Sequence, residues 1–165
     1  MPVYLFTYHA YRSWMPDHRR GFTKDGEGYQ PPNPALANAY NEAAAHVPFE
    51  FDHVTQRCLI EVALDVCARR NWRFHAGATE LTHLHALTSW RDGAEWEDVR
   101  GKLRNIMSWA LSRRSNTKGR PWFVEGASRK HVERDAHFEY LIETYLPDHS
   151  GWRWDERRGW TEPRG

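Results

Sequence analysis

Residues 71–90, NWRFHAGATELTHLHALTSW, contain two neighbouring segments whose composition is typical of strands. We interpret residues 71–78 as one strand and residues 80–90 as the next, because β-branched and aromatic residues favour strands. Gly77 suits a tight turn or kink between them. The stretch predicts that the chain is built around a β-sheet.

Two histidines stand out in the second of these strands. His83 and His85 are two residues apart, so their imidazoles point to the same face of a strand while Leu84 packs into the core. Two imidazoles on one face are able to bind a divalent metal ion, but a third ligand is needed to complete the site. The alternative is a pair of histidines on the solvated face of a half-buried strand.

The segments on either side complete a β-α-β-β-α-β-α order. Asp52 is a plausible N-cap for the first long helix, and Pro147 is expected to end the last one. The other expected elements are strands over 3–11 and 122–124, a loop over 12–34, and helices over 34–45, 52–70, 95–114 and from 134 or 135 onward. This order predicts an α+β fold of the ferredoxin-like kind, an antiparallel sheet with helices on one face.

The last predicted helix carries an apolar stripe and a tyrosine. Phe138, Leu141, Ile142 and Tyr145 follow helical spacing, and His149 is one further turn beyond Tyr145. A phenol has a pKa of about 10, but a nearby cation and a desolvated pocket help it to act as a phenolate nucleophile. The alternative is that Tyr145 is a core aromatic with its hydroxyl at the surface.

Charge is distributed unevenly along the chain. The 165 residues carry a net charge of +1, which by itself argues against a wholly basic nucleic-acid-binding protein. Residues 101–134, however, carry +7, and the remainder carries −6. Trp109, Trp122 and Phe123 lie among these basic residues, a combination that fits phosphate neutralisation with base stacking. The alternative is a solvated helix face with ordinary core aromatics.

The length suits a single domain, which we place at residues 1–150, followed by a Trp/Arg-rich tail over 151–165 that we expect to be poorly ordered. Cys58 and Cys67 are too few for a disulfide framework or a four-cysteine zinc site. The first residues lack the pattern of a signal peptide, and no stretch approaches 18 apolar residues. We therefore expect a cytoplasmic protein without a membrane span.

Taken in order, these features resemble those of the single-tyrosine HUH transposases, the group of small insertion-sequence and REP-associated tyrosine transposases. The opening pattern of that family resembles Tyr8 to Pro16 followed by Arg19-Arg20-Gly21. Its paired metal ligands match His83-Leu84-His85, and its tyrosine helix resembles residues 135–149. In that helix the fourth residue after the nucleophile is a metal-ligand position.

The spacing of four residues between the nucleophile and the metal ligand distinguishes the two candidate tyrosines. The residue four positions after Tyr145 is His149, a credible metal ligand, whereas the residue four positions after Tyr140 is Thr144, a poor one. The resemblance therefore selects Tyr145 as the nucleophile and leaves Tyr140 as the alternate.

The resemblance implies a metal-dependent DNA transposase that cleaves and rejoins single-stranded, hairpin-forming DNA. Tyr145 would attack phosphorus, form a 5′-phosphotyrosine and release a 3′-OH, with Mg²⁺ or Mn²⁺ held by His83, His85 and His149. It also implies a homodimer and a nucleoid-associated location. The basic residues expected to hold the DNA backbone are Arg113, Arg114, Lys118, Arg120, Arg129 and Lys130.

Two other functions stay open at this point. A non-catalytic, domesticated nucleic-acid-binding regulator needs the basic segment but no metal. A small zinc hydrolase is a third class, because three histidines satisfy zinc, although its general base is then unnamed.

Overall fold

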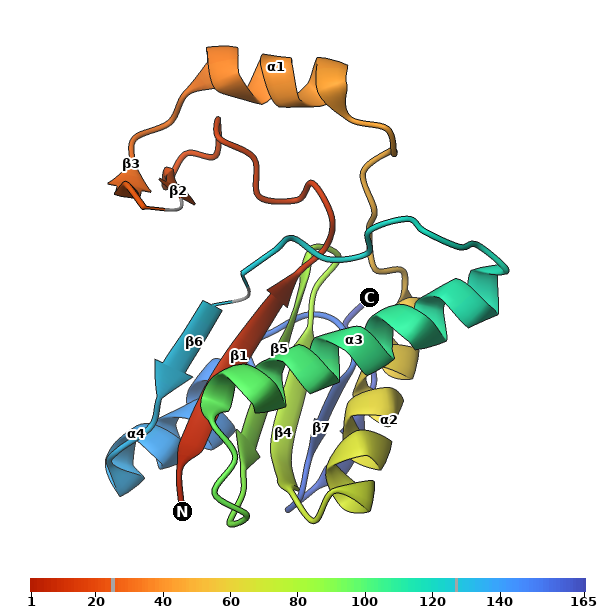
Figure 1. The fold of residues 1–165 in the computed structure, drawn as a ribbon. Coiled ribbons are helices and arrows are strands. Elements are labelled where there is room, and N and C mark those ends of the chain that lie inside the picture. The colour runs from red at the N-terminus through yellow and green to blue at the C-terminus, as the bar shows by residue number, and fades with distance from the viewer. Residues whose placement is uncertain (25, 127) are drawn as a thin grey trace.

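In the computed structural model, which describes residues 1–24, 26–126 and 128–165, most of the chain lies in or close to one sheet (Figure 1). The helical elements are α1 (Pro34–Ala43), α2 (His53–Arg69), α3 (Trp96–Ser115), α4 (Asp135–Tyr140) and the π-helical turn η1 (Leu141–Tyr145). The strands are β1 (Val3–His9), β2 (Phe22–Lys24), β3 (Gly28–Gln30), β4 (Arg73–Thr79), β5 (His83–Ser89), β6 (Ser128–His131), β7 (Arg153–Asp155) and β8 (Gly159–Thr161).

The main sheet has the strand order β6-β1-β5-β4-β7-β8, and its neighbouring strands are antiparallel. β5 lies between β1 and β4, the two strands that are connected through α2. With α3 between β5 and β6, this connectivity is the β-α-β-β-α-β arrangement of ferredoxin-like domains. The α+β fold with an antiparallel sheet that the sequence predicts is confirmed.

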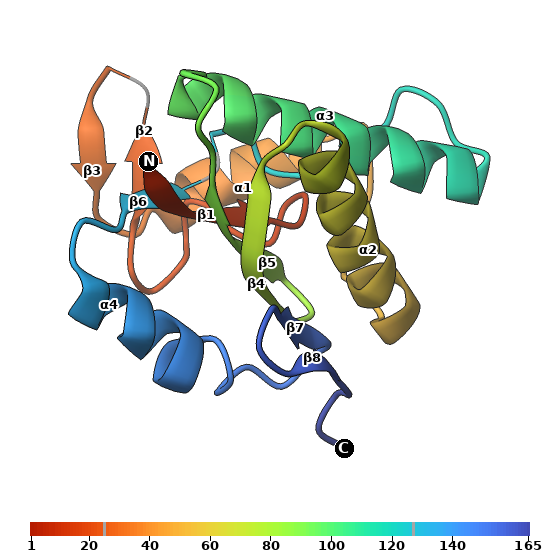
Figure 2. The same cartoon turned by 90° about the horizontal axis from the view of Figure 1, so that it is seen from below.

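The two faces of the sheet carry different helices, because side chains alternate along each strand. Phe6 and Leu84 pack on one face with α2 and α3, and Leu87 packs on the other with Leu141 of η1. Helices α2 and α3 share one face as expected, and the shorter segment α4–η1 covers the opposite one (Figure 2). His85 is on the same side of β5 as Leu87, and therefore on the side of α4–η1.

The edge strand next to β1 is not the one that the sequence predicts. The prediction of a strand over 122–124 is wrong: within the described residues this stretch makes one isolated bridge, between Phe123 and Ala10. Its aromatic residues Trp122 and Phe123 are buried in the core instead. The exposed segment Ser128–His131 pairs with β1. Edge strands are often polar and charged, so this strand lacks the apolar pattern from which strands are predicted.

The C-terminal tail is ordered, so the expectation of poor order is wrong. β7 pairs with β4, and β8 pairs with β7. The rings of Trp152 and Trp160 meet edge to face, and the guanidinium of Arg57 lies 4.6 and 4.8 Å from their centroids. Trp154 packs on Phe74, with the ring centroids 5.7 Å apart. The tail extends the sheet because its three tryptophans pack against α2 and β4.

Gly77 lies inside β4 and not between the strands, which corrects the turn expected there. A Cβ atom at this position would stand 2.7 Å from Cζ of Phe74, so the aromatic ring occupies the space of the missing side chain. The chain turns over residues 80–82, where the backbone N–H of Glu80 donates to the carbonyl oxygen of His83.

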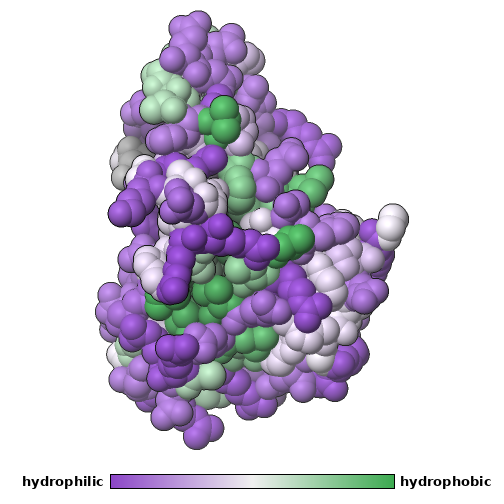
Figure 3. Space-filling model, turned by 90° about the vertical axis from the view of Figure 1, so that its right-hand side faces the viewer, coloured by the Kyte–Doolittle hydropathy of each residue, from purple (hydrophilic) through white to green (hydrophobic). Residues whose placement is uncertain are grey.

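Residues 12–24 and 26–50 form an arm beyond the end of β1 (Figure 1). The loop predicted over 12–34 contains the hairpin β2–β3, and α1 follows with Asn33 as its N-cap. From the side shown in Figure 3, the arm at the top is largely hydrophilic and hydrophobic residues gather across the body below it. Among the described residues, no helix has the length and apolar character needed to cross a membrane.

Candidate active site

Three histidines from distant parts of the chain meet beside the sheet. His83 and His85 project from β5, and His149 follows η1. A potential ligand nitrogen of each lies within 4.8 Å of those of the other two. The ring centroids are 4.8 Å apart for His83 and His85, 5.7 Å for His83 and His149, and 4.7 Å for His85 and His149. The three sequence-predicted ligands form one cluster that is able to hold a metal ion.

The other ring nitrogens of the cluster are held by hydrogen bonds. Nδ1 of His85 lies 2.8 Å from Oγ1 of Thr7, and Nδ1 of His83 lies 3.0 Å from Oγ1 of Thr82. Nδ1 of His149 donates to the carbonyl oxygen of Tyr145 at 3.0 Å. Because a carbonyl oxygen only accepts, Nδ1 of His149 carries a proton, which leaves Nε2 as the nitrogen of this ring that is able to bind a metal ion. Contacts of this kind fix the ring orientation and tautomer of metal-binding histidines.

Burial keeps two of these rings neutral. It lowers the pKa of His83 to about 4, with the nearby His9 and His149 adding to the effect. Burial likewise lowers the pKa of His85 to about 2, helped by His83 and His149. A neutral imidazole is the form that binds a metal ion. Near neutral pH, both rings therefore present lone pairs.

Tyr145 is in direct contact with this cluster. Its hydroxyl lies 3.2 Å from Nε2 of His85, and its ring lies 5.1 Å from that of His149. Burial raises the pKa of the Tyr145 phenol, the neighbouring Tyr140 raises it further, and the charge of Arg20 opposes the shift. The desolvated pocket therefore opposes ionisation, contrary to the expectation from the sequence, and the phenol is protonated near neutral pH in the absence of another cation.

The alternate tyrosine lies outside this contact. Tyr140 is 52% exposed at the end of α4, and its ring centroid is 6.4 Å from that of Tyr145. Of these two tyrosines, it is Tyr145 whose hydroxyl contacts a histidine of the cluster.

Tyr145 lies in a segment where the helix type changes. The sequence predicts a regular helix from 134 or 135 to Pro147, but residues Leu141–Tyr145 form a π-helical turn, in which the N–H of Leu146 donates to the carbonyl oxygen of Leu141. Leu141, Ile142 and Leu146 are buried against the sheet, and Tyr145 lies beside them next to His85. π-Helical turns are rare and occur frequently at functional sites. No feature of the sequence indicated it.

The cluster opens into a hollow of about 330 Å³. Its lining residues are Glu80, His83, Tyr140, Thr144, Tyr145, Asp148 and His149. The carboxylate of Glu80 accepts hydrogen bonds from the backbone N–H and hydroxyl of Ser150, at 2.6 and 2.5 Å. Burial opposes ionisation of Glu80, but these hydrogen bonds outweigh it and lower the pKa of the carboxyl group. An ionised carboxylate thus lies in the same hollow.

Sequence reasoning missed Glu80 and also His9. The last residue of β1, His9, pairs with His83 in the β1–β5 register, and their rings are 5.7 Å apart. Burial lowers the pKa of His9, and His18 adds to this effect. Neither residue belongs to the His-x-His pattern. Only the pairing of β1 with β5 brings His9 to the cluster, and Glu80 is recognised by its contact with Ser150.

The six predicted DNA-binding residues are divided among α3, the loop after it and β6, and they are not gathered at the histidine cluster. Arg129 and Lys130 belong to β6, and the guanidinium of Arg129 lies 4.0 Å over Trp96, the first residue of α3. Arg113 is near the other end of that helix, 5.2 Å over Trp109. A helix of 20 residues is about 30 Å long, so these two groups are far apart.

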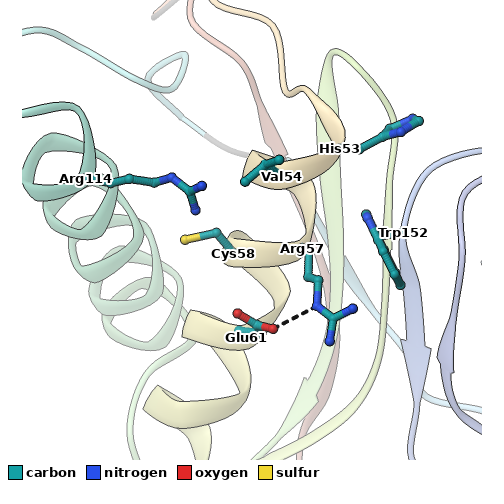
Figure 4. Close-up of a pocket in the computed structure, with 7 residues that line it drawn as sticks. All are labelled: His53, Val54, Arg57, Cys58, Glu61, Arg114 and Trp152. Atoms are coloured by element: carbon teal, nitrogen blue, oxygen red, sulfur yellow. Dashed lines mark hydrogen bonds and ion pairs between the residues drawn. The ribbon is translucent and has the colours of Figure 1, made fainter.

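The remaining three basic residues lie at the far end of α3 or after it. Lys118 is exposed in the following loop, and Arg120 donates to the carbonyl oxygen of Val47 while lying 4.7 Å over Trp122. Arg114 lines a second hollow of about 380 Å³ between α2, α3 and the tail (Figure 4). Its other lining residues are His53, Val54, Arg57, Cys58, Glu61 and Trp152. α3 itself packs on the sheet face opposite Tyr145.

The fold and the site together define an α+β protein in which a tyrosine contacts a cluster of three histidines. No family model and no curated protein matches the chain. Its structure resembles that of a REP-associated tyrosine transposase bound to a REP hairpin, with 9% identity and a TM-score of 0.49, over 88% of this chain and 64% of that one. The chain thus spans less than two thirds of that transposase.

A second similar structure is that of a candidate transposase from Deinococcus radiodurans r1. It shares 12% identity and a TM-score of 0.44, over 92% of this chain and 93% of that one. Structural neighbours of the chain thus include two proteins described as transposases.

Proposed function

We propose that this chain is a metal-dependent, transposase-like enzyme that cleaves and rejoins single-stranded DNA, with Tyr145 as its nucleophile. The observation that carries the proposal is the contact between the Tyr145 hydroxyl and Nε2 of His85 within the three-histidine cluster. A nucleophile next to a group that binds a Lewis-acidic ion is the arrangement that phosphoryl transfer needs. The order of sequence motifs supports the same class of enzyme.

The donor set fits a divalent cation held by His83, His85 and His149. Burial keeps the rings of His83 and His85 neutral, and Nε2 of His149 is not engaged by the hydrogen bond that holds Nδ1. Three imidazoles are nitrogen donors, and Mg²⁺ prefers oxygen ligands, so of the two ions that the family resemblance implies we favour Mn²⁺. The bound ion would polarise the scissile phosphate and offset the charge that develops on its oxygens.

The residues of the chain perform the remaining steps. The oxygen of Tyr145 attacks phosphorus, the bond from phosphorus to the 3′ oxygen breaks, and the strand carries a 5′-phosphotyrosine. The phenol loses one proton and the departing 3′ oxygen gains one, so the reaction is balanced without a further reagent. Rejoining is the reverse reaction, in which a 3′-OH attacks the phosphotyrosine. In the metal-free protein, the hydroxyl lies 3.2 Å from Nε2 of the neutral His85 ring, a contact that holds the phenol oxygen toward the cluster.

The family resemblance extends this proposal to hairpin-forming DNA as the substrate and to a homodimer as the active form. Arg113 and Arg114 are proposed to hold more distant parts of the DNA, because α3 packs on the sheet face opposite Tyr145. DNA binding by Lys118, Arg120, Arg129 and Lys130 stays a prediction.

The test is covalent attachment. The wild-type chain is incubated with a labelled hairpin oligonucleotide carrying single-stranded flanks, with Mn²⁺, Mg²⁺ or EDTA. We expect an SDS-resistant adduct with Mn²⁺ that disappears with EDTA, and mass spectrometry should locate the nucleotide on the peptide containing Tyr145. Binding of the oligonucleotide without any adduct would instead support a non-catalytic regulator.

One observation favours a second function. An all-imidazole donor set is also a set that zinc accepts, with water as its fourth ligand. Hydrolysis of ester substrates with Zn²⁺, unchanged when Tyr145 is replaced by phenylalanine, would support a zinc hydrolase in place of the transposase-like enzyme.

A further inference from the structure

A row of aromatic rings leads from the histidine cluster to the loop after β1. His9 lies beside His83, with ring centroids 5.7 Å apart. The ring of Trp14 is 4.9 Å from that of His9, and His18 stacks on Trp14 at 3.9 Å with an interplanar angle of 15°. The site thus continues from the proposed metal ligands to the partly exposed ring of His18.

The loop that carries Trp14 and His18 is fixed by its own hydrogen bonds. The N–H of His18 donates to Met15, the N–H of Gly21 donates to His18, and the indole N–H of Trp14 donates to the carbonyl oxygen of Gly21. Gly21 has a φ of +73°, and a Cβ there would stand 2.3 Å from the carbonyl oxygen of Gln30. Another residue would be strained at this position. The indole is therefore held in place before any ligand binds.

Two cations project from the same loop. Arg19 and Arg20 are both exposed, and no ion pair within the described parts of the chain involves either of them. The charge of Arg20 also acts on the Tyr145 phenol, which is consistent with a position on the side of the active site. In the tail, by contrast, Arg157 and Arg158 are paired with carboxylates of α4–η1.

We propose that residues Trp14–Arg20 form the subsite for the nucleotide next to the reacting phosphate. A base of the single strand extends the ring stack on the outer face of His18, and Arg19 and Arg20 hold the phosphates on either side of that base. Base stacking on rings with flanking arginines is how proteins bind single strands without reading their sequence. The placement of this subsite beside the reacting phosphate rests on the proposed function. Binding of a single strand to the subsite, however, is measurable without cleavage.

The basic end of α3 is the competing surface. It also offers an exposed ring with a neighbouring cation, since Trp109 is 60% exposed and lies under Arg113. However, α3 packs on the sheet face opposite Tyr145, whereas the row from Trp14 ends at the histidine cluster. The Trp14–Arg20 loop, and not the end of α3, is therefore joined by a continuous row of rings to the cluster that Tyr145 contacts.

The experiment compares the two surfaces by binding alone. The affinity of a fluorescent single-stranded oligonucleotide is measured by anisotropy, in EDTA and over a range of salt concentrations, for full-length protein. The variants of the proposed subsite are R19Q/R20Q, H18A and H18F. The variant R113Q/R114Q measures the contribution of the competing surface at the end of α3. We expect R19Q/R20Q to weaken binding about tenfold and to reduce the slope of log affinity against log salt by about 1.4, the value for two phosphates. H18A should lose about tenfold and H18F, which keeps a ring, should recover most of it.

Any one of three results would overturn the proposed subsite. The variant R113Q/R114Q could lose as much affinity as R19Q/R20Q, H18A could bind like the wild type, or the wild type could fail to bind a single strand. Failure of the proposed function gives a different result. The wild type then binds the oligonucleotide and the loop variants bind it more weakly, but no covalent adduct forms with Mn²⁺.

Discussion

The hydroxyl of Tyr145 lies 3.2 Å from Nε2 of His85. These residues are 60 positions apart in the chain, Tyr145 in η1 and His85 in β5. The two elements pack together because the apolar residues of η1 cover the face of β5 that carries His85. One atom pair thus joins the proposed nucleophile to the proposed metal ligands. Two predictions rest on this contact, one on the identity of the nucleophile and one on the dependence on a cation.

Replacing Tyr145 by phenylalanine should abolish covalent attachment and preserve binding. The change removes one oxygen and leaves the ring packed beside His85, so that the fold is retained. Loss of a nucleophile costs at least about a thousandfold in rate. Tyr140→Phe is the matched control, because Tyr140 is exposed and lies 6.4 Å from the ring of Tyr145. Adduct yield on denaturing gels compares the two variants. An adduct formed by Tyr145→Phe would exclude Tyr145 as the nucleophile, and loss of the adduct in Tyr140→Phe would then assign Tyr140.

Metal binding should depend on each histidine of the cluster. His83→Ala or His149→Ala leaves two imidazoles, and we expect Mn²⁺ affinity to fall at least about tenfold when one ligand is lost. Calorimetric titration measures this effect independently of DNA. His53→Ala is the control, since His53 is exposed in the second hollow (Figure 4). Equal affinity in wild type and His83→Ala would show that the ion binds elsewhere.

The sequence predicted those parts of the site that depend on local periodicity. His83 and His85 lie on one face because side chains alternate along a strand, and Asp52 caps α2 as its position indicated. His9 escaped prediction because it joins the cluster through the β1–β5 register, a long-range pairing. The π-helical turn under Tyr145 escaped for another reason: it depends on how η1 packs on the sheet and not on its residue types.

The fold, like the site, was predicted from the sequence where it depends on local periodicity. The long helices and the paired central strands follow from apolar periodicity, which tertiary packing then reinforces. The edge strand Ser128–His131 has no such periodicity, because all four of its residues are exposed to solvent. The tail was misjudged because charges alternate with its tryptophans. Packing against α2 and β4, which cannot be read locally, is what orders Trp152 and Trp154.

Stability should fall as the pH drops below about 6.5. The folded-state pKa values of His83 and His85 are lowered to about 4 and about 2, so the unfolded chain binds more protons than the native one in this range. Each such histidine contributes a slope of up to about 1.4 kcal/mol per pH unit, which persists until the pH reaches its folded-state pKa. Urea unfolding at pH 7, 6, 5 and 4 measures the slope. His85→Gln should reduce it, and an unchanged slope would contradict burial of a neutral ring.

Adding one methyl group at Gly151 should disturb the site more than adding one in a helix. A Cβ at Gly151 would stand 2.4 Å from both the Thr79 carbonyl oxygen and Oε1 of Gln56, so the chain after His149 has to move. Gly151→Ala should therefore lower both the free energy of unfolding, by about 1–3 kcal/mol, and the affinity for Mn²⁺. Gly101 has open space around it inside α3, and Gly101→Ala should stabilise by about 0.5–1 kcal/mol. Equal melting temperatures for the two variants would refute this reading.

Glu80 should act on the metal site through the segment that carries His149. Its carboxylate accepts two hydrogen bonds from Ser150, the residue after His149, and thereby ties that segment to the turn between β4 and β5. Glu80→Ala removes both bonds, and we expect Mn²⁺ affinity to fall about three- to tenfold, because a mispositioned ligand binds less tightly. Glu80→Gln keeps an oxygen that accepts from the backbone N–H of Ser150 and should recover part of the loss. If Glu80 were instead a direct ligand, Glu80→Gln would bind as weakly as Glu80→Ala, so calorimetry on the pair separates positioning from coordination.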